Sequence, residues 1–447
     1  MADKEIKLEK LAKRKEAYLK DDKFTVIRHA LSHNSFNDIF YSKDNASNTN
    51  FTFSIDVPTL PVTNQRRSGR CWIFSATNLL RERIAKELNI KGQFELSQNY
   101  IAYYDKLEKY NYHAEGIIDL ISKGVSKDDR KVNFLLSGVG DGGQWAMYTA
   151  IVKKYGVVPK DAFPENAQSN ETMGSSRLCN SALRKFAADA FNSYAKDHDL
   201  NKLYALKERY NQKIYNIITS SFGVPPEKFD FEYVDKDDKY HIEKGLTPKG
   251  FFEKYIGSYI DEFVSFINAP TKDKEYGQTY SLEYVGNVVG AKPIVHLNIE
   301  FDRLEKLIIE NLKNGEIVWF GSDVGKNGDR EAGIWDNELL DFSTAFDVSL
   351  VFDKAEMLDF GQSAMNHAMC ITGVDLKNGK PVRWKIENSW GDANGDKGFY
   401  IMSESFFRSF VYQAAIRKEY LSEEELKNLE KEPILLPPWD PFGTLAD

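Results

Sequence analysis

The sequence predicts an α+β fold, with helices early in the chain and an antiparallel sheet in its last third. Apolar residues recur at every fourth position from Trp72 to Leu88, which is the spacing of one helical face. From Lys292 onward, short apolar runs are separated by Gly, Asn or Asp, as in strands joined by turns. The 447 residues, 42% of them hydrophobic, can form one large elaborated domain or two domains.

The first two thirds of the chain carry the predicted helices. We expect helices over residues 4–19, from Cys71 onward and around residues 143–155. Two prolines in residues 56–65 predict an extended approach to the helix at Cys71. Residues 160–290 are rich in charge, Tyr and Phe and contain long helical patterns, so we expect a helical insertion there.

The last third contains the predicted strands, in the segments KPIVHLNIE, EIVWFGSDVG, HAMCITGVDL, VRWKIENSW and GFYIM. In VRWKIEN, Val382, Trp384 and Ile386 alternate with polar residues, which indicates a strand with one buried face. The alternation places Asn388 on that buried face and Glu387 on the opposite face.

Composition and charge exclude several classes of protein. The formal net charge of -8 argues against a nucleic-acid binder, because such proteins carry basic surfaces. No stretch has the roughly 18 apolar residues of a membrane span, and the charged N-terminal segment lacks the apolar core of a secretory signal. The three cysteines, Cys71, Cys179 and Cys370, form no disulfide framework and fit a reducing compartment. The expectation is a cytoplasmic enzyme.

Cys71 stands where the segment NQRRSGR gives way to a helical pattern. A thiol attacks only as the thiolate, and the partial positive charge of a helix N-terminus stabilises that anion. Arg70 beside it adds a weaker positive field. The alternative is a buried small hydrophobic side chain, which is the commoner role of a cysteine outside a disulfide.

A nucleophilic cysteine needs a histidine to take its proton, and the sequence offers seven. His367 is favoured because it begins an expected strand directly after the polar turn GQSAMN. His296 lies inside another expected strand, where a purely structural role is the alternative. Composition alone leaves the seven histidines nearly unranked.

The imidazole also needs a partner that fixes its tautomer and ring angle. The interval from His367 to Asn388 fits a strand, a turn and a return strand, so the two can pair across an antiparallel ladder. Trp390 is positioned to cover that hydrogen bond. The alternative is that this Asn and the following Gly serve only the turn. Gln65, shortly before Cys71, has a side-chain amide that can donate to an oxyanion. A single glutamine is weak evidence and counts only together with the Cys, His and Asn residues.

Taken together, these motifs resemble those of the papain-like cysteine peptidases, which have a helical lobe and an antiparallel β-sheet lobe. The matching motifs are Gln65, SGRCW, NHA, NSWG and GFY. Compact members separate Cys and His by roughly 130–150 residues. Cys71 and His367 lie much farther apart, which requires a large insertion. The bleomycin hydrolase and bacterial aminopeptidase C branch has such an insertion, and NQRRSGRCWIF, GVGDGGQW, VWFGSDVGK, MNHAMCITGVD, KIENSWG and LPPWDPFGTLAD resemble it.

The resemblance implies a role for each site residue. Cys71 is the expected nucleophile, which forms a thioester acyl-enzyme, and His367 is the general base and acid. Asn388 orients His367, and Gln65 lines the oxyanion hole. Gly142 and Gly143 are expected to hold the substrate's main chain, since glycine permits close backbone approach. The alternative for GVGDGG, a phosphate loop, lacks the Lys-Ser/Thr ending of a Walker motif.

The resemblance also assigns a function to the C-terminal tail. The tail is expected to enter the active-site cleft, with its terminal carboxylate pairing with the free amine of a peptide substrate. Trp439 and Pro441 are the expected anchors of the segment. Ala446 and Asp447 then lie at the substrate's N-terminus, and Asp447 is either trimmed or retained as a second negative charge.

The implied protein is a cytoplasmic homohexamer that acts on peptides with a free N-terminus and uses no metal and no cofactor. Its expected divisions are an N-terminal extension that packs on the catalytic lobes, a helical lobe with the nucleophile, a helical insertion for oligomerisation, a β-rich lobe with His and Asn, and a tail. They cover residues 1–62, 63–159, 160–290, 291–430 and 431–447.

Three other functions remain open at this stage. The first is an endopeptidase or oligopeptidase of the same fold. The second is a scaffold without catalysis, against which the presence of Gln65, Cys71, His367 and Asn388 argues. The third is nucleic-acid binding through the basic segments KLAKRK and NQRRSGR, against which the acidic balance argues.

Overall fold

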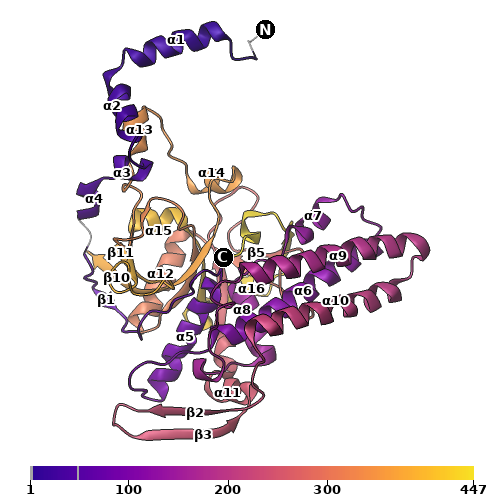
Figure 1. Ribbon diagram of the computed structural model, residues 1–447. Helices are drawn as coiled ribbons and strands as arrows, with labels where there is room; N and C mark the ends of the chain where they lie inside the picture. Colours follow the sequence, from indigo (N-terminus) through magenta and orange to yellow (C-terminus); the bar gives the residue numbers. More distant parts are fainter. Residues whose placement is uncertain (1–3, 48–49, 447) are drawn as a thin grey trace.

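The computed structural model describes residues 4–47 and 50–446, and Figure 1 shows their arrangement. The helices in chain order are α1 (Leu8–Leu19), α2 (Asp22–Leu31), α3 (Phe36–Phe40), α4 (Lys43–Ser47), α5 (Cys71–Glu87), α6 (Gln98–Ser122), α7 (Arg130–Ser137), α8 (Trp145–Tyr155), α9 (Met173–Asp197), α10 (Leu200–Phe222), α11 (Pro248–Tyr255), α12 (Phe301–Lys313), α13 (Phe342–Phe346), α14 (Lys354–Asp359), α15 (Glu404–Phe410) and α16 (Glu423–Leu429). Four short 3-10 helices are η1 (Lys160–Ala162), η2 (Gly257–Glu262), η3 (Lys418–Tyr420) and η4 (Pro441–Gly443).

The strands in chain order are β1 (Ile55–Asp56), β2 (Phe229–Val234), β3 (Tyr240–Leu246), β4 (Phe263–Ile267), β5 (Thr279–Leu282), β6 (His296–Asn298), β7 (Val318–Ser322), β8 (Gly328–Asp329), β9 (Ile334–Trp335), β10 (His367–Lys377), β11 (Lys380–Glu387), β12 (Phe399–Ser403), β13 (Val411–Arg417) and β14 (Ile434–Leu436). All except β2 and β3 join one sheet in the order β14-β5-β6-β4-β13-β7-β10-β11-β12-β9-β8, with β1 on β10. Most pairings are antiparallel, and the parallel ones are β9–β12, β5–β14 and β4–β6. The predicted α+β class is confirmed.

The N-terminal part of helix α5 is enclosed, and its first ten residues, Cys71–Leu80, are all buried. It packs against β7 and β10 of the sheet and against α6 and α8. Its buried hydroxyls donate to backbone carbonyls within the helix, Ser75 to Cys71 and Thr77 to Ile73, each at 2.8 Å. Burial of these ten residues makes the N-terminal part of α5 a fixed support for Cys71, its first residue.

The predicted helices and strands lie close to the observed ones. The helix expected from residue 143 begins at Trp145, and the helix expected over residues 4–19 begins at Leu8. The helix at Cys71 and the strand at His367 begin at the predicted residues. Asn388 follows the last residue of β11 and does not lie within the strand.

Residues 160–290 differ from the expected helical insertion. They are mainly helical up to Phe222, where α9 and α10 form the long pair of antiparallel helices on the right of Figure 1. Beyond Phe222 the chain forms the β2–β3 hairpin, and then β4 and β5 enter the main sheet. The segments FVSFI and TYSL are short apolar runs, and burial within the sheet decides their structure.

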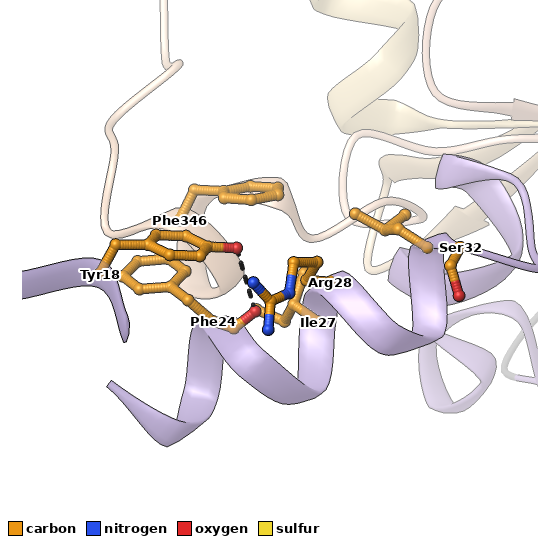
Figure 2. A pocket seen from close by; sticks show the side chains of 7 residues that line it. Tyr18, Phe24, Ile27, Arg28, Ser32 and Phe346 are labelled. Atoms are coloured by element: carbon orange, nitrogen blue, oxygen red, sulfur yellow. Dashed lines mark hydrogen bonds between the residues drawn. The ribbon is translucent and has the colours of Figure 1, made fainter. Parts of the chain in front are cut away.

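The N-terminal segment projects from the body of the molecule (Figure 1). None of the residues of α1 is buried, so this helix does not pack on the lobes as the sequence suggested. Aromatic packing holds the end of α1 against the start of α2, where Tyr18 stacks on Phe24 with ring centroids 5.4 Å apart. Figure 2 shows these two rings beside Phe346 of α13, where they line a shallow pocket.

Glu387 is buried, although the strand alternation placed it on the polar face. Its carboxylate accepts from Arg81 Nη2 at 3.0 Å and from Asn78 Nδ2 at 2.7 Å, and both donors lie on α5. Arg81 also donates to the carbonyl of Pro61 at 2.9 Å. Burial raises the pKa of Glu387 to about 7 although Arg81 opposes the shift. The interaction therefore ties β11, directly before Asn388, to the helix that begins at Cys71.

Removing one partner of this buried pair should destabilise the protein strongly. We expect Arg81→Met to lower the free energy of unfolding by about 3–5 kcal/mol, because it leaves a carboxylate buried without a cation. The double variant Arg81→Met/Glu387→Gln should regain most of that loss. Urea denaturation of the single and double variants measures both, and a single variant as stable as the double would contradict this account.

Candidate active site

Cys71 is the first residue of α5 and is completely buried. Its thiol therefore lies at the positive end of the helix dipole, away from bulk water. The neighbouring guanidinium of Arg70 forms a bidentate ion pair with Glu165, at 3.0 and 3.1 Å. Because a carboxylate neutralises this guanidinium, Arg70 contributes less field at the thiol than the sequence suggested.

His367 is the first residue of β10, which packs directly against α5. The backbone N–H of Ala368 donates to Cys71 Sγ at 3.4 Å. One turn further along the helix, Cys370 Sγ donates to the carbonyl of Ser75 at 3.2 Å. These two contacts fix the start of β10 against the start of α5. His367, the residue before Ala368, therefore lies beside the Cys71 thiol.

Asn388 holds the ring of His367. His367 Nε2 lies 2.9 Å from Asn388 Oδ1, which also accepts from the backbone N–H of Ser389 at 2.8 Å. An amide oxygen is only an acceptor, so the ring proton is assigned to Nε2 and Nδ1 keeps its lone pair. The ring of Trp390 lies over His367 with centroids 4.9 Å apart. This packing shields the His–Asn hydrogen bond from water, as predicted.

Burial sets the charge of His367. Desolvation lowers its pKa to about 4, although the hydrogen bond to Asn388 acts in the opposite direction. Arg330, whose guanidinium stacks on Trp390 at 4.4 Å, lowers the pKa further. At neutral pH the ring is therefore a neutral base that can accept a proton at Nδ1.

Gln65 joins the loop before Cys71 to the loop after Asn388. Its Nε2 donates to the carbonyl of Ser68 at 2.5 Å, and its Oε1 accepts from Ser389 Oγ at 2.5 Å. The backbone N–H of Gln65 donates to the carbonyl of Ser389 at 2.8 Å. Because Ser68 supplies a carbonyl, the amide orientation is fixed and one hydrogen of Nε2 remains for another acceptor.

The segment Asp141–Gly143 lies beside the indole of Trp72. Trp72 Nε1 donates to the carbonyl of Asp141 at 2.8 Å, and a Cβ on Gly143 would lie 2.5 Å from the Trp72 ring. The Asp141 carboxylate accepts from the backbone N–H of Gly69 at 3.1 Å and from Lys106. Burial alone would raise the pKa of Asp141, but Lys106 outweighs it and holds the pKa at about 2. This segment is thus locked to the loop that precedes Cys71.

The end of the chain lies along this segment. Gly143 N–H donates to the carbonyl of Ala446 at 3.1 Å, and Ala446 N–H donates to the carbonyl of Gly143 at 3.2 Å. This is a short antiparallel pairing, and Ala446 is completely buried in it. Asp447 lies outside the described residues.

The anchors of the tail differ from those that the sequence suggested. Trp439 is 38% exposed, with the guanidinium of Arg130 stacked on it at 3.9 Å. The buried anchors are Asp440, paired with Lys274 at 2.9 Å, and the ring of Phe442. The Lys274 ammonium, which also pairs with Asp273 at 2.8 Å, thus fixes Asp440 and not the larger neighbouring side chain of Trp439.

Gln144 also holds the tail, and sequence analysis did not select it. Its Nε2 donates to the carbonyls of Phe442 at 3.0 Å and Thr444 at 2.9 Å. His296 fixes the amide through Nε2 at 3.0 Å from Gln144 Oε1. His296 is therefore a hydrogen-bonded sheet residue that supports the tail indirectly. The motif GVGDGGQW contained Gln144, but its partners lie at the far end of the chain.

Among the described residues, no group of three or more His, Cys, Asp or Glu side chains is arranged to hold a metal ion. A search of the described helices found none with the length and apolar character that a membrane crossing requires.

A buried thiol at a helix start, an imidazole at a strand start and an orienting amide, in a helical and β-sheet frame, define a papain-like cysteine peptidase. The chain belongs to the Peptidase C1-like family, whose model matches residues 5–443. The resemblance noted in the sequence is confirmed.

Its relatives extend over most of the chain. It is 46% identical over 399 residues to aminopeptidase C of Lactobacillus delbrueckii subsp. lactis, covering 88% of each chain. It is 43% identical over 431 residues to aminopeptidase C of Streptococcus thermophilus, covering 96% of each. The crystal structure of PepW from Lactobacillus rhamnosis HN001 has 42% identity and a TM-score of 0.96, covering 99% of this chain and 100% of that one.

The lowered pKa of His367 predicts acid sensitivity. The native state keeps the ring neutral down to a pH of about 4, whereas the unfolded chain protonates it near 6.5, so stability is lost as pH falls through this window. His367→Gln should reduce the slope of unfolding free energy against pH by up to about 1.4 kcal/mol per pH unit. Denaturant titrations between pH 7 and 4 measure the slope, and identical slopes would contradict the assignment.

Proposed function

We propose that this chain is a cysteine aminopeptidase that removes residues from the N-terminus of peptides through a thioester intermediate. The observation that carries the proposal is the pairing of Ala446 with Gly143, which puts the chain's own C-terminal segment beside the candidate nucleophile loop. The relatives named aminopeptidase C support the same activity.

The proposed chemistry begins with proton transfer from Cys71 Sγ to His367 Nδ1. The thiolate, stabilised by the α5 dipole and by the N–H of Ala368, attacks the carbonyl carbon of the first peptide bond. The remaining Nε2 hydrogen of Gln65 and the backbone N–H of Cys71 stabilise the oxyanion. The imidazolium then protonates the leaving amine, and a thioester remains on Cys71.

Hydrolysis of the thioester completes the cycle. His367 Nδ1 takes a proton from water, and the resulting hydroxide attacks the thioester carbonyl. The sulfur leaves as a thiolate, and the amino acid is released as a carboxylic acid. Asn388 holds the ring in one tautomer throughout, because its Oδ1 accepts only from Nε2–H.

The tail sets how many residues are removed. A longer substrate would place its own backbone against Gly142 and Gly143, where Ala446 is already hydrogen-bonded. The negative charge at the chain end then pairs with the substrate's free amine, whether Asp447 is retained or is trimmed to leave the carboxylate of Ala446. The tail thus excludes extended substrates and favours a free N-terminus.

We also propose that the chain assembles as a homohexamer. Helix α1 buries none of its residues, and Leu8, Leu11 and Leu19 on it are 83%, 44% and 51% exposed. The α9–α10 pair likewise exposes Met173 and Leu178, at 66% and 56%. Apolar surface of this kind on projecting elements is typical of protein contacts. The proposed location is the cytoplasm, with which three buried cysteines in no disulfide agree.

Product analysis of one unblocked peptide tests the proposed activity. Mass spectrometry over time should show loss of one N-terminal residue after another, and the N-acetylated peptide should resist cleavage. Cys71→Ala should lower kcat by a factor on the order of 10⁶, because it removes the nucleophile. Cys179→Ala, at the buried cysteine of α9, is the matched control and should retain activity. Preferential cleavage of the blocked peptide would favour an endopeptidase and contradict the aminopeptidase.

Truncation after Gly443 tests the tail. Removing residues 444–447 takes away the pairing with Gly143 and moves the terminal carboxylate back to Gly443, but leaves Phe442 in place. We expect kcat/KM for unblocked peptides to fall by roughly 10–100-fold, since a hydrogen bond to a charged group contributes about 1.5–3 kcal/mol. Cleavage of blocked peptides should rise. Trp439→Ala, which alters the tail outside the cleft, is the control, and an unchanged preference in the truncated chain would refute the tail's role.

A further inference from the structure

A buried ammonium group lies behind the segment that holds the tail. Lys109 on α6 is 2% exposed, and its Nζ donates to the carbonyl of Gly142 at 2.5 Å. The same Nζ lies 3.3 Å from the carbonyl of Asp141 and 2.7 Å from Asp105 Oδ2. It also lies 5.0 Å from the centroid of the Trp72 ring. The Lys109 ammonium thus lies between the Trp72 ring and the backbone of Gly142–Gly143.

Lys109 and the tail contact the two ends of one peptide group. The carbonyl of Gly142 accepts from Lys109, while the N–H of Gly143, in the same peptide group, donates to the carbonyl of Ala446 at 3.1 Å. A cation at the carbonyl end draws electron density from the amide and makes its N–H a stronger donor. Hydrogen bonds in such a chain strengthen one another, by about 10–30% for each bond.

The surroundings fix this cation firmly in place. Asp105 accepts from Asn287 Nδ2 at 2.9 Å, and Asn287 also donates to the carbonyl of Met147 at 3.0 Å, which ties the pair to α8. A buried ion pair alone contributes little net stability, because desolvation offsets the Coulomb attraction. The Lys109 ammonium also donates to the backbone carbonyls of Asp141 and Gly142, so its role extends beyond pairing with Asp105.

We propose that Lys109 is a positioning residue that acts through the Gly142–Gly143 peptide group to tighten the hydrogen bond to whichever backbone lies against it. In the full chain that backbone is the tail, and in a chain without the tail it is an extended peptide. The consequence of this positioning, the exclusion of long substrates, rests on the proposed function. The effect is independent of the substrate's side chains, because only main-chain atoms are involved.

The first test follows the tail directly and needs no catalysis. In the Cys71→Ala full chain, amide hydrogen exchange of residues 444–446 is compared with and without the pair Asp105→Asn/Lys109→Met. The double change avoids leaving Asp105 buried without a cation. We expect exchange at these residues to become roughly tenfold faster. Lys207→Met, at a lysine of α10 that is 9% exposed and pairs with Glu115 on α6, is the control and should leave exchange unchanged.

The second test separates positioning from loss of structure. In the chain truncated after Gly443, Asp105→Asn/Lys109→Met should raise KM for an N-blocked peptide about tenfold and change kcat by less than threefold. A folded double variant with unchanged exchange at residues 444–446 would overturn the proposal, as would a fall in kcat at constant KM. If the wild-type chain removes no N-terminal residues, the proposed function fails, whereas the exchange result still decides the role of Lys109.

Discussion

The arrangement depends on one contact, between the N-terminus of α5 and the first residues of β10. Ala368 N–H meets Cys71 Sγ there, although the two residues come from opposite ends of the catalytic region. The buried N-terminal part of α5, the Cys370–Ser75 contact and the Arg81–Glu387 pair hold the two elements in one register. If β10 shifted by one residue, the ring of His367 would turn to the other face of the sheet and leave the thiol.

A second constraint acts at Gly143. The peptide group that would hold a substrate's backbone is already used by Ala446, and a side chain at Gly143 would collide with Trp72. The tail is held further back by Asp440, Phe442 and Gln144, so only its last residues depend on the Gly143 contact. In the proposed aminopeptidase, specificity for chain ends follows from the chain occupying part of its own cleft, with Lys109 setting how tightly it does so.

Local sequence patterns predicted where the helix and the strand that carry the site begin. Cys71 at a helix start and His367 at a strand start follow from periodicity and turn residues, and the resemblance added Gly143 and Ala446. The burial of Glu387 was missed because its partner, Arg81, is distant in sequence, and strand alternation does not reveal it. The strands β4 and β5 were missed because the sheet decides their structure. Trp439 was an expected anchor of the tail, whereas the pairing with Lys274 makes its neighbour Asp440 the anchor.

The pH dependence of Cys71 alkylation tests the central claim most directly. Iodoacetamide reacts with the thiolate, so its rate reports whether the α5 dipole and His367 stabilise that anion. The account predicts selective modification of Cys71 well below pH 8.5, where an ordinary thiol ionises, because neutral His367 takes the thiol proton, and His367→Ala should move the rise in rate up toward pH 8.5. A wild-type rate that rises only near pH 8.5, unaffected by His367→Ala, would contradict it.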